Sequence, residues 1–80
     1  MPNLSTLRQT PELVALGATI RRLRFDKGLS QEDLALLVGI DRSYLGRVER
    51  GDNNVAILTL KKISDGLETS TSEILRLSLL

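Results

Sequence analysis

Residues 29–51 read LSQEDLALLVGIDRSYLGRVERG, and this stretch predicts two short helices that follow each other closely. Ser30 is a favourable N-cap, and Asp33 stands three residues later at the acid position of a capping box. Gly39 ends this helix after barely two turns, because glycine readily takes the left-handed conformation of a helix C-cap. Asp41 then caps the next helix, so the two helices are joined by a connection of only about three residues.

This short connection predicts how the two helices cross. A turn of three or four residues that contains glycine and joins two short helices is typical of a helix-turn-helix, in which the helices meet at a steep angle. Ala35 is small where the helices would approach each other, and Ile40 and Leu45 would fill the space between them. A structural αα-corner in an ordinary helical bundle has the same local pattern, so this stretch alone leaves both interpretations open.

Apolar residues at helical spacing continue on both sides of the stretch. A helix over about residues 12–27 is predicted by Leu13, Leu16, Ile20 and Leu23. A fourth helix, fading at Gly66, is predicted by Ile57, Leu60 and Ile63. A fifth, capped by Ser70 or Thr71, is predicted by Ile74, Leu75 and Leu77. No window alternates as a strand would, so we predict an all-α, five-helix domain over residues 12–80, preceded by an arm over residues 1–11.

The composition excludes several classes of function. The 80 residues include no cysteine and no histidine, which excludes a zinc finger, a thiol nucleophile, a disulfide and an imidazole base. The longest apolar run, residues 34–38, is far too short to span a membrane, and residues 1–20 lack the pattern of a secretory signal. We therefore expect a cytoplasmic protein that is not an enzyme and uses no metal, cofactor, membrane or small-molecule substrate.

The net charge of +1 conceals an uneven distribution of basic residues. Four bases and one acid lie between Arg21 and Lys27, and three bases and one acid lie between Arg42 and Arg50. Ordinary solvated helix faces have such clusters too, so a polyanion-binding surface needs a further reason.

That reason comes from a resemblance that covers nearly the whole chain. The matching segments are Leu29–Ala35, Val38–Ile40, Ser43–Leu45 and Val48–Gly51, with Leu16, Ile20, Leu23 and Arg24 before them and Asn54, Ile57, Thr59, Leu60, Lys62, Ile63 and Ser70 after them. Together they resemble the lambda-repressor-like (XRE-type) family of helix-turn-helix DNA-binding domains. Residues 41–45 and 49–54 also look like the small controller proteins of restriction-modification systems, although prophage regulators share these motifs.

The resemblance implies that the third helix enters the major groove of duplex DNA and contacts bases. Arg42, Ser43 and Arg47 fall on the positions that read bases in the phage repressors. Each arginine is able to make a bidentate contact with guanine, whereas serine is a more permissive reader. A solvated or phosphate-bound arginine is the alternative at both positions.

Five further residues fall where the family contacts the DNA backbone: Gln31, Tyr44, Arg50, Asn53 and Asn54. The backbone N–H of Gln31 lies at the positive end of a helix dipole, which favours an anion. Packing alone would explain Tyr44 almost as well, and Asn54 has the alternative of capping the fourth helix.

Two charged residues match a structural pair of the family. Arg24 and Glu49 correspond to a partly buried salt bridge that joins the first and third helices, so we assign Arg24 to the fold and not to DNA. Leu36 and Leu37 depart from the pattern, because relatives usually carry polar residues there. RNA polymerase, which activating relatives touch through acids on the second helix, is therefore only a further candidate partner.

The C-terminal residues predict a partner chain. Residues 74–80 hold five apolar side chains in seven positions, and an exposed apolar patch usually marks an interface. The family commonly dimerises through the fourth and fifth helices, which makes interface candidates of Leu58, Ile74, Leu75 and Leu79. A tail that packs back on its own core is the alternative.

These residues together predict a homodimeric transcriptional regulator that binds a pseudo-palindromic site in double-stranded DNA, including its own promoter. An autoregulatory controller of a restriction-modification operon fits this description. The competing class is a helix-turn-helix module for protein interaction, antitoxin-like or an adaptor, without specific DNA binding.

Overall fold

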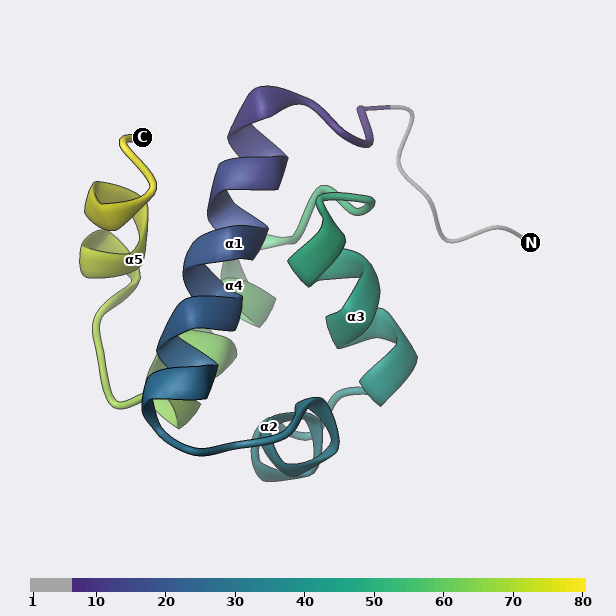
Figure 1. The fold of residues 1–80 in the computed structure, drawn as a ribbon, viewed down its shortest axis with the longest axis vertical. Helices are drawn as coiled ribbons and strands as arrows, with labels where there is room; N and C mark the ends of the chain where they lie inside the picture. Colours follow the sequence, from purple (N-terminus) through teal and green to yellow (C-terminus); the bar gives the residue numbers. More distant parts are fainter. Residues whose placement is uncertain (1–6) are drawn as a thin grey trace.

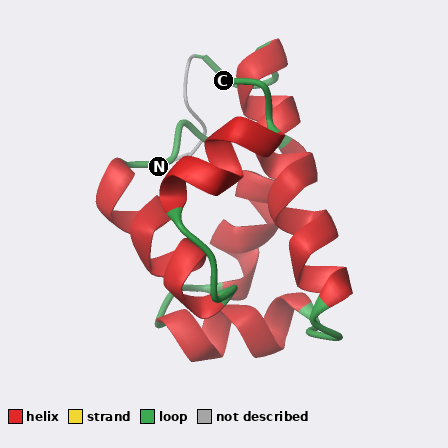
Figure 2. Cartoon of the chain, turned by 90° about the vertical axis from the view of Figure 1, so that its left-hand side faces the viewer, coloured by secondary structure: helices red, strands yellow, loops and turns green. Residues whose placement is uncertain are grey.

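Five α-helices make up the fold of residues 7–80, the part of the chain that the structure, a computed structural model, describes (Figure 1). They are α1 (Pro11–Asp26), α2 (Gln31–Val38), α3 (Arg42–Arg50), α4 (Ile57–Gly66) and α5 (Thr71–Leu77). This part of the chain contains helices and loops without a strand (Figure 2), which confirms the predicted all-α class. Within it, no helix has the length and apolar character that crossing a membrane requires.

The helix ends agree closely with the signals in the sequence. Ser30 and Asp33 form both hydrogen bonds of a capping box at the start of α2. Gly39 ends α2 with φ 77°, a left-handed conformation that an L side chain rarely adopts. Asp41 occupies the N-cap position of α3 as predicted, but its side chain makes no capping hydrogen bond. Ser70, not Thr71, caps α5.

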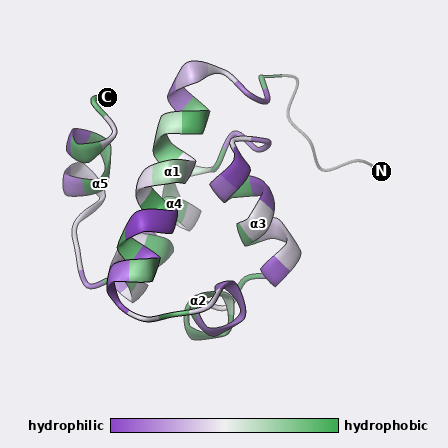
Figure 3. Ribbon diagram, viewed as in Figure 1, coloured by the Kyte–Doolittle hydropathy of each residue, from purple (hydrophilic) through white to green (hydrophobic). Residues whose placement is uncertain are grey.

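Each helix contributes one hydrophobic residue without exposed surface to the core: Ile20, Leu34, Leu45, Ile63 and Ile74. Figure 3 shows hydrophobic positions recurring among hydrophilic ones along the helices. The prediction that Ile74 lies in a dimer interface is therefore wrong, because its side chain has no surface to offer a second chain. Ile57, one of the apolar residues whose spacing predicts the fourth helix, begins α4 and is 63% exposed.

A glycine brings α1 and α3 close together. A Cβ atom added at Gly17 would overlap the backbone carbonyl oxygens of Val48 and Glu49. Figure 1 shows α1 in the middle of the fold, with α5 on one side and α3 on the other. The close packing against α1 holds one face of α3 in place and leaves the opposite face of this helix uncovered.

Candidate nucleic-acid interface

The uncovered face of α3 begins at the N-terminal end of the helix. Arg42 and Ser43 are both exposed there, whereas Leu45 and Val48 point into the core. An α-helix fits the major groove, and residues near the N-terminus of a recognition helix are the ones that reach base edges. The structure thus brings two of the three predicted base readers together on one accessible surface.

Arg47, the third predicted base reader, lies differently. Its guanidinium carbon is 5.8 Å from the centre of the Tyr44 ring, so the side chain lies over the tyrosine. Its Nε atom is buried and has no hydrogen-bond partner among residues 7–80. Arg47 and Tyr44 line an open hollow of about 500 Å³ beside α3, together with residues 39–41, Asn53 and Thr59.

The Tyr44 hydroxyl is directed toward α4. Burial raises the pKa of Tyr44, against the opposing effects of a hydrogen bond with Thr59 and the positive charge of Arg47. Tyr44 and Thr59 also line the same hollow beside α3.

A series of hydrogen-bonded side chains connects Arg42 to the buried ion pair of Arg24 and Glu49. Arg24 donates to Glu49 through Nε (2.7 Å) and Nη2 (2.9 Å), and the two residues are only 5% and 8% exposed. Gln31 donates to Oε1 of Glu49 over 3.0 Å and accepts a hydrogen bond from Nη1 of Arg42 over 3.5 Å. These hydrogen bonds link α1, α2 and α3, and they place Gln31 beside the guanidinium of Arg42.

The predicted backbone contacts after α3 fall into two groups. Arg50 and Asn54 are exposed in or next to the loop that follows the helix. Asn53 is buried, and its Oδ1 has no partner within the described part of the chain. The alternative in which Asn54 caps α4 is wrong, because Ala56 occupies the N-cap position and no side chain bonds there.

Sequence reasoning missed the contact between this loop and the segment that precedes α1. The backbone N–H of Gln9 donates to the carbonyl of Gly51 over 2.6 Å. Its side-chain amide donates to the carbonyl of Arg50 (2.7 Å) and to Oδ1 of Asp52 (2.6 Å). Of the two interpretations of this segment, a loose arm or a short extra turn, the structure has the turn at residues 7–9, held on the loop by Gln9. Residues 1–6 of the predicted arm lie outside the described residues. No periodicity or motif marks this contact, which joins residues more than 40 positions apart.

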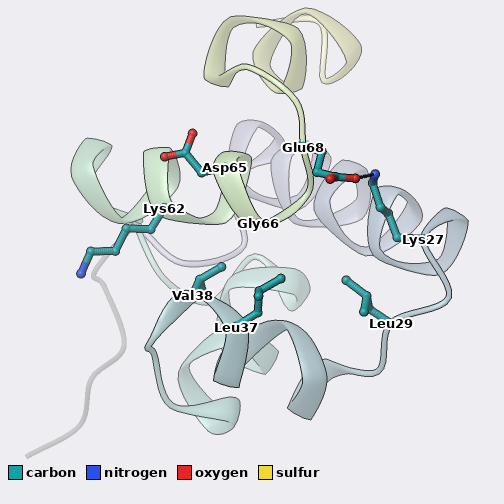
Figure 4. A pocket seen from close by; sticks show the side chains of 8 residues that line it. All are labelled: Lys27, Leu29, Leu37, Val38, Lys62, Asp65, Gly66 and Glu68. Carbon is teal, nitrogen blue, oxygen red and sulfur yellow. Dashed lines mark hydrogen bonds and ion pairs between the residues drawn. The ribbon is translucent and has the colours of Figure 1, made fainter.

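A separate hollow lies between α2 and α4 and is shown in Figure 4. It has a volume of about 600 Å³, with Leu29, Leu37 and Val38 below and an ion pair between Lys27 and Glu68 at its edge. None of the predicted DNA-contacting residues lines it.

Comparison with known proteins agrees with this geometry. The model of a helix-turn-helix family matches residues 20–74. The control protein C.MunI of a Mycoplasma species is 39% identical over 62 residues, which cover 76% of this chain and 84% of the relative. The control protein C.SmaI of Serratia marcescens is 40% identical over 60 residues, which cover 75% and 71% of the two chains.

The solved structures include a close match as well. The crystal structure of the restriction-modification controller protein C.AhdI from Aeromonas hydrophila aligns with a TM-score of 0.80 and 46% sequence identity, over 81% of this chain and 98% of the other. The fold, the exposed end of α3 and these relatives together show that the chain belongs to the helix-turn-helix family, in its lambda-repressor-like (XRE-type) branch of DNA-binding regulators.

Proposed function

We propose that this protein regulates transcription by placing α3 in the major groove of duplex DNA and reading bases with Arg42, Ser43 and Arg47. The observation that carries the proposal is the exposure of Arg42 and Ser43 at the N-terminal end of a helix that the core holds from behind. Arg42 and Arg47 each supply about 1–3 kcal/mol of discrimination for a well-formed pair with guanine. For Arg47, this requires the side chain to leave the ring of Tyr44.

Phosphate contacts from Gln31, Tyr44, Arg50, Asn53 and Asn54 would position the domain on the DNA, and those of Tyr44 and Asn53 require their partly or fully buried side chains to turn outward. Gln31 is the first residue of α2, where the backbone N–H groups of the helix point toward an approaching anion. Arg50 and Asn54 are exposed beside the C-terminal end of α3. Contacts of this kind carry most of the salt dependence of binding, whereas the base contacts select the sequence.

We further propose that the protein acts as a homodimer on a pseudo-palindromic site. Leu58 is 75% exposed and Leu79 is 92% exposed, and Leu77 and Leu80 are exposed as well. Leu75 is half-buried against the core of its own chain, so only its edge is available to a partner. A two-fold dimer would present two α3 helices about 34 Å apart, one turn of B-DNA.

The relatives named as control proteins and restriction-modification controllers suggest the regulated genes. We propose that this chain controls a restriction-modification operon in the cytoplasm and binds its own promoter. A contact with RNA polymerase would fall on α2, where Glu32 is exposed but Leu36 and Leu37 are exposed as well. The two leucines weigh against an activating contact made by acids of α2.

The test is a binding titration with duplexes selected from a random DNA pool. A specific binder enriches a two-fold symmetric sequence and loses affinity steeply as salt rises. No retarded complex at low salt would contradict the proposal and favour a protein-interaction module. Sedimentation of the free protein tests the dimer, and Leu79→Glu is expected to yield a monomer with the same fold.

A further inference from the structure

The segment before α1 and the loop after α3 meet at one carboxylate. Oδ1 of Asp52 accepts hydrogen bonds from the amide of Gln9 (2.6 Å) and from Nη2 of Arg8 (3.4 Å). Oδ2 accepts from Nε of Arg50 over 3.2 Å. Asp52 thus joins a basic residue from each side of the contact, at the end of α3 opposite to Arg42.

The two arginines remain largely in solvent while the carboxylate between them does not. The side chains of Arg8 and Arg50 are 51% and 62% exposed, whereas that of Asp52 is 10% exposed. One negative charge between two positive charges leaves an excess of +1 at this place. A guanidinium has five N–H donors in a planar fork, so a single contact with Asp52 leaves donors on each arginine for an anion.

Arg8 contributes little to the docking of its own segment. The backbone and amide bonds of Gln9 hold the segment on residues 50–52. The contact of Arg8 with Asp52 is long and half-exposed, and ion pairs of this kind add little to stability. The structure therefore offers no folding role that would account for an arginine here.

We propose that Arg8 binds a backbone phosphate of duplex DNA, together with Arg50, and that Asp52 and Gln9 position the two guanidinium groups for it. This inference rests on the proposed function, because it extends the contact surface of α3 to the segment before α1. Arginine pairs recognise phosphate through charge-assisted, often bidentate hydrogen bonds. The contact carries no sequence information, so it strengthens binding to every duplex equally.

The experiment measures the slope of log K against log salt for four proteins: wild type, Arg8→Ala, Arg8→Lys and Arg22→Ala. Each is titrated with a duplex selected by the wild type and with a random-sequence duplex. The matched control is Arg22, an exposed arginine of α1 that lines a hollow together with Leu77 of α5. Figure 1 shows α5 and α3 on opposite sides of α1. Thermal unfolding of each variant shows that the fold is intact.

We expect Arg8→Ala to reduce the magnitude of the slope on both duplexes by about 0.9 for each bound protomer, which is about 1.8 for the proposed dimer because one phosphate contact is lost from each subunit. Arg8→Lys keeps the charge and most of the slope, and Arg22→Ala keeps the wild-type slope. An unchanged slope in Arg8→Ala, an equal change in Arg22→Ala, or a loss confined to the selected duplex would overturn the inference while the proposed function stands. Failure of the wild type to bind either duplex would instead overturn the proposed function, and this inference with it.

Discussion

Charged residues serve different purposes on the two faces of α3. On the inner face, Glu49 is buried and paired with Arg24 behind the helix. On the outer face, Arg42 and Ser43 are exposed, and the nearest neighbour bonded to Arg42 is Gln31 at 3.5 Å. The difference teaches that charge alone does not identify a binding residue in this fold. Burial and the number of partners separate the arginine that holds the helix from those that are free to meet a ligand.

The largest effect, on the free energy of unfolding, is expected from removing the buried ion pair on the inner face of α3. Glu49→Ala leaves Arg24 buried without its carboxylate, which costs about 3–5 kcal/mol for a buried pair. The free energy of unfolding from urea denaturation measures this loss. Glu73→Ala breaks the exposed pair with Arg76 instead, and such pairs contribute only about 0–1 kcal/mol. Equal effects of the two substitutions would contradict the distinction that burial makes.

The close contact of α1 with the inner face gives the next largest effect. Gly17→Ala places a methyl group against the carbonyl oxygens of Val48 and Glu49, and overpacking of this kind costs about 1–3 kcal/mol. Helix propensity alone predicts the opposite sign, a gain of about 1 kcal/mol for alanine over glycine. Urea denaturation therefore decides between the two, since a stabilised variant would show that α1 does not limit the position of α3.

The smallest effect concerns the pH dependence at the end of α3. A hydrogen bond from Gln9, followed by contacts with Arg50 and Arg8, lowers the pKa of Asp52 against the opposing effect of burial. A lowered pKa in the folded state contributes stability above the pKa of the unfolded chain, about 3.9, and this stability is lost as the pH falls through the folded value. Urea midpoints between pH 5 and pH 2 should therefore fall less steeply in Asp52→Asn than in wild type. Identical slopes would show that Asp52 has no special role in acid unfolding.

The sequence predicts those features of the fold that depend on neighbouring residues. The capping box of Ser30 and Asp33 and the left-handed Gly39 are local signals, and both lie where the pattern places them. Ile74 was misplaced because the C-terminal residues are almost all apolar, so spacing alone could not separate the buried residue from exposed Leu79. The contact of Gln9 with Asp52 depends on tertiary packing between distant segments, and no local pattern encodes it.

In the candidate site, the exposure of residues at the start of α3 could be predicted from the sequence, but the orientation of individual side chains could not. The exposure of Arg42 and Ser43 follows from their place at the start of a helix whose apolar residues face inward. The orientation of Arg47 over Tyr44, and the partial burial of Tyr44, depend on the tertiary surroundings of α3. Side-chain arrangements of this kind follow from the packed structure, because several rotamers are compatible with the same helix.

The central claim, that the outer face of α3 reads bases, is tested most directly by selecting DNA from a random pool with the wild type and with Arg42→Ala. Arg42 is exposed, so the variant should keep the wild-type stability to within about 0.5 kcal/mol. We predict that the variant loses the preference for guanine at one position in each half-site and retains the rest of the selected sequence. An unchanged selected sequence, bound more weakly throughout, would contradict the claim and make Arg42 a phosphate contact.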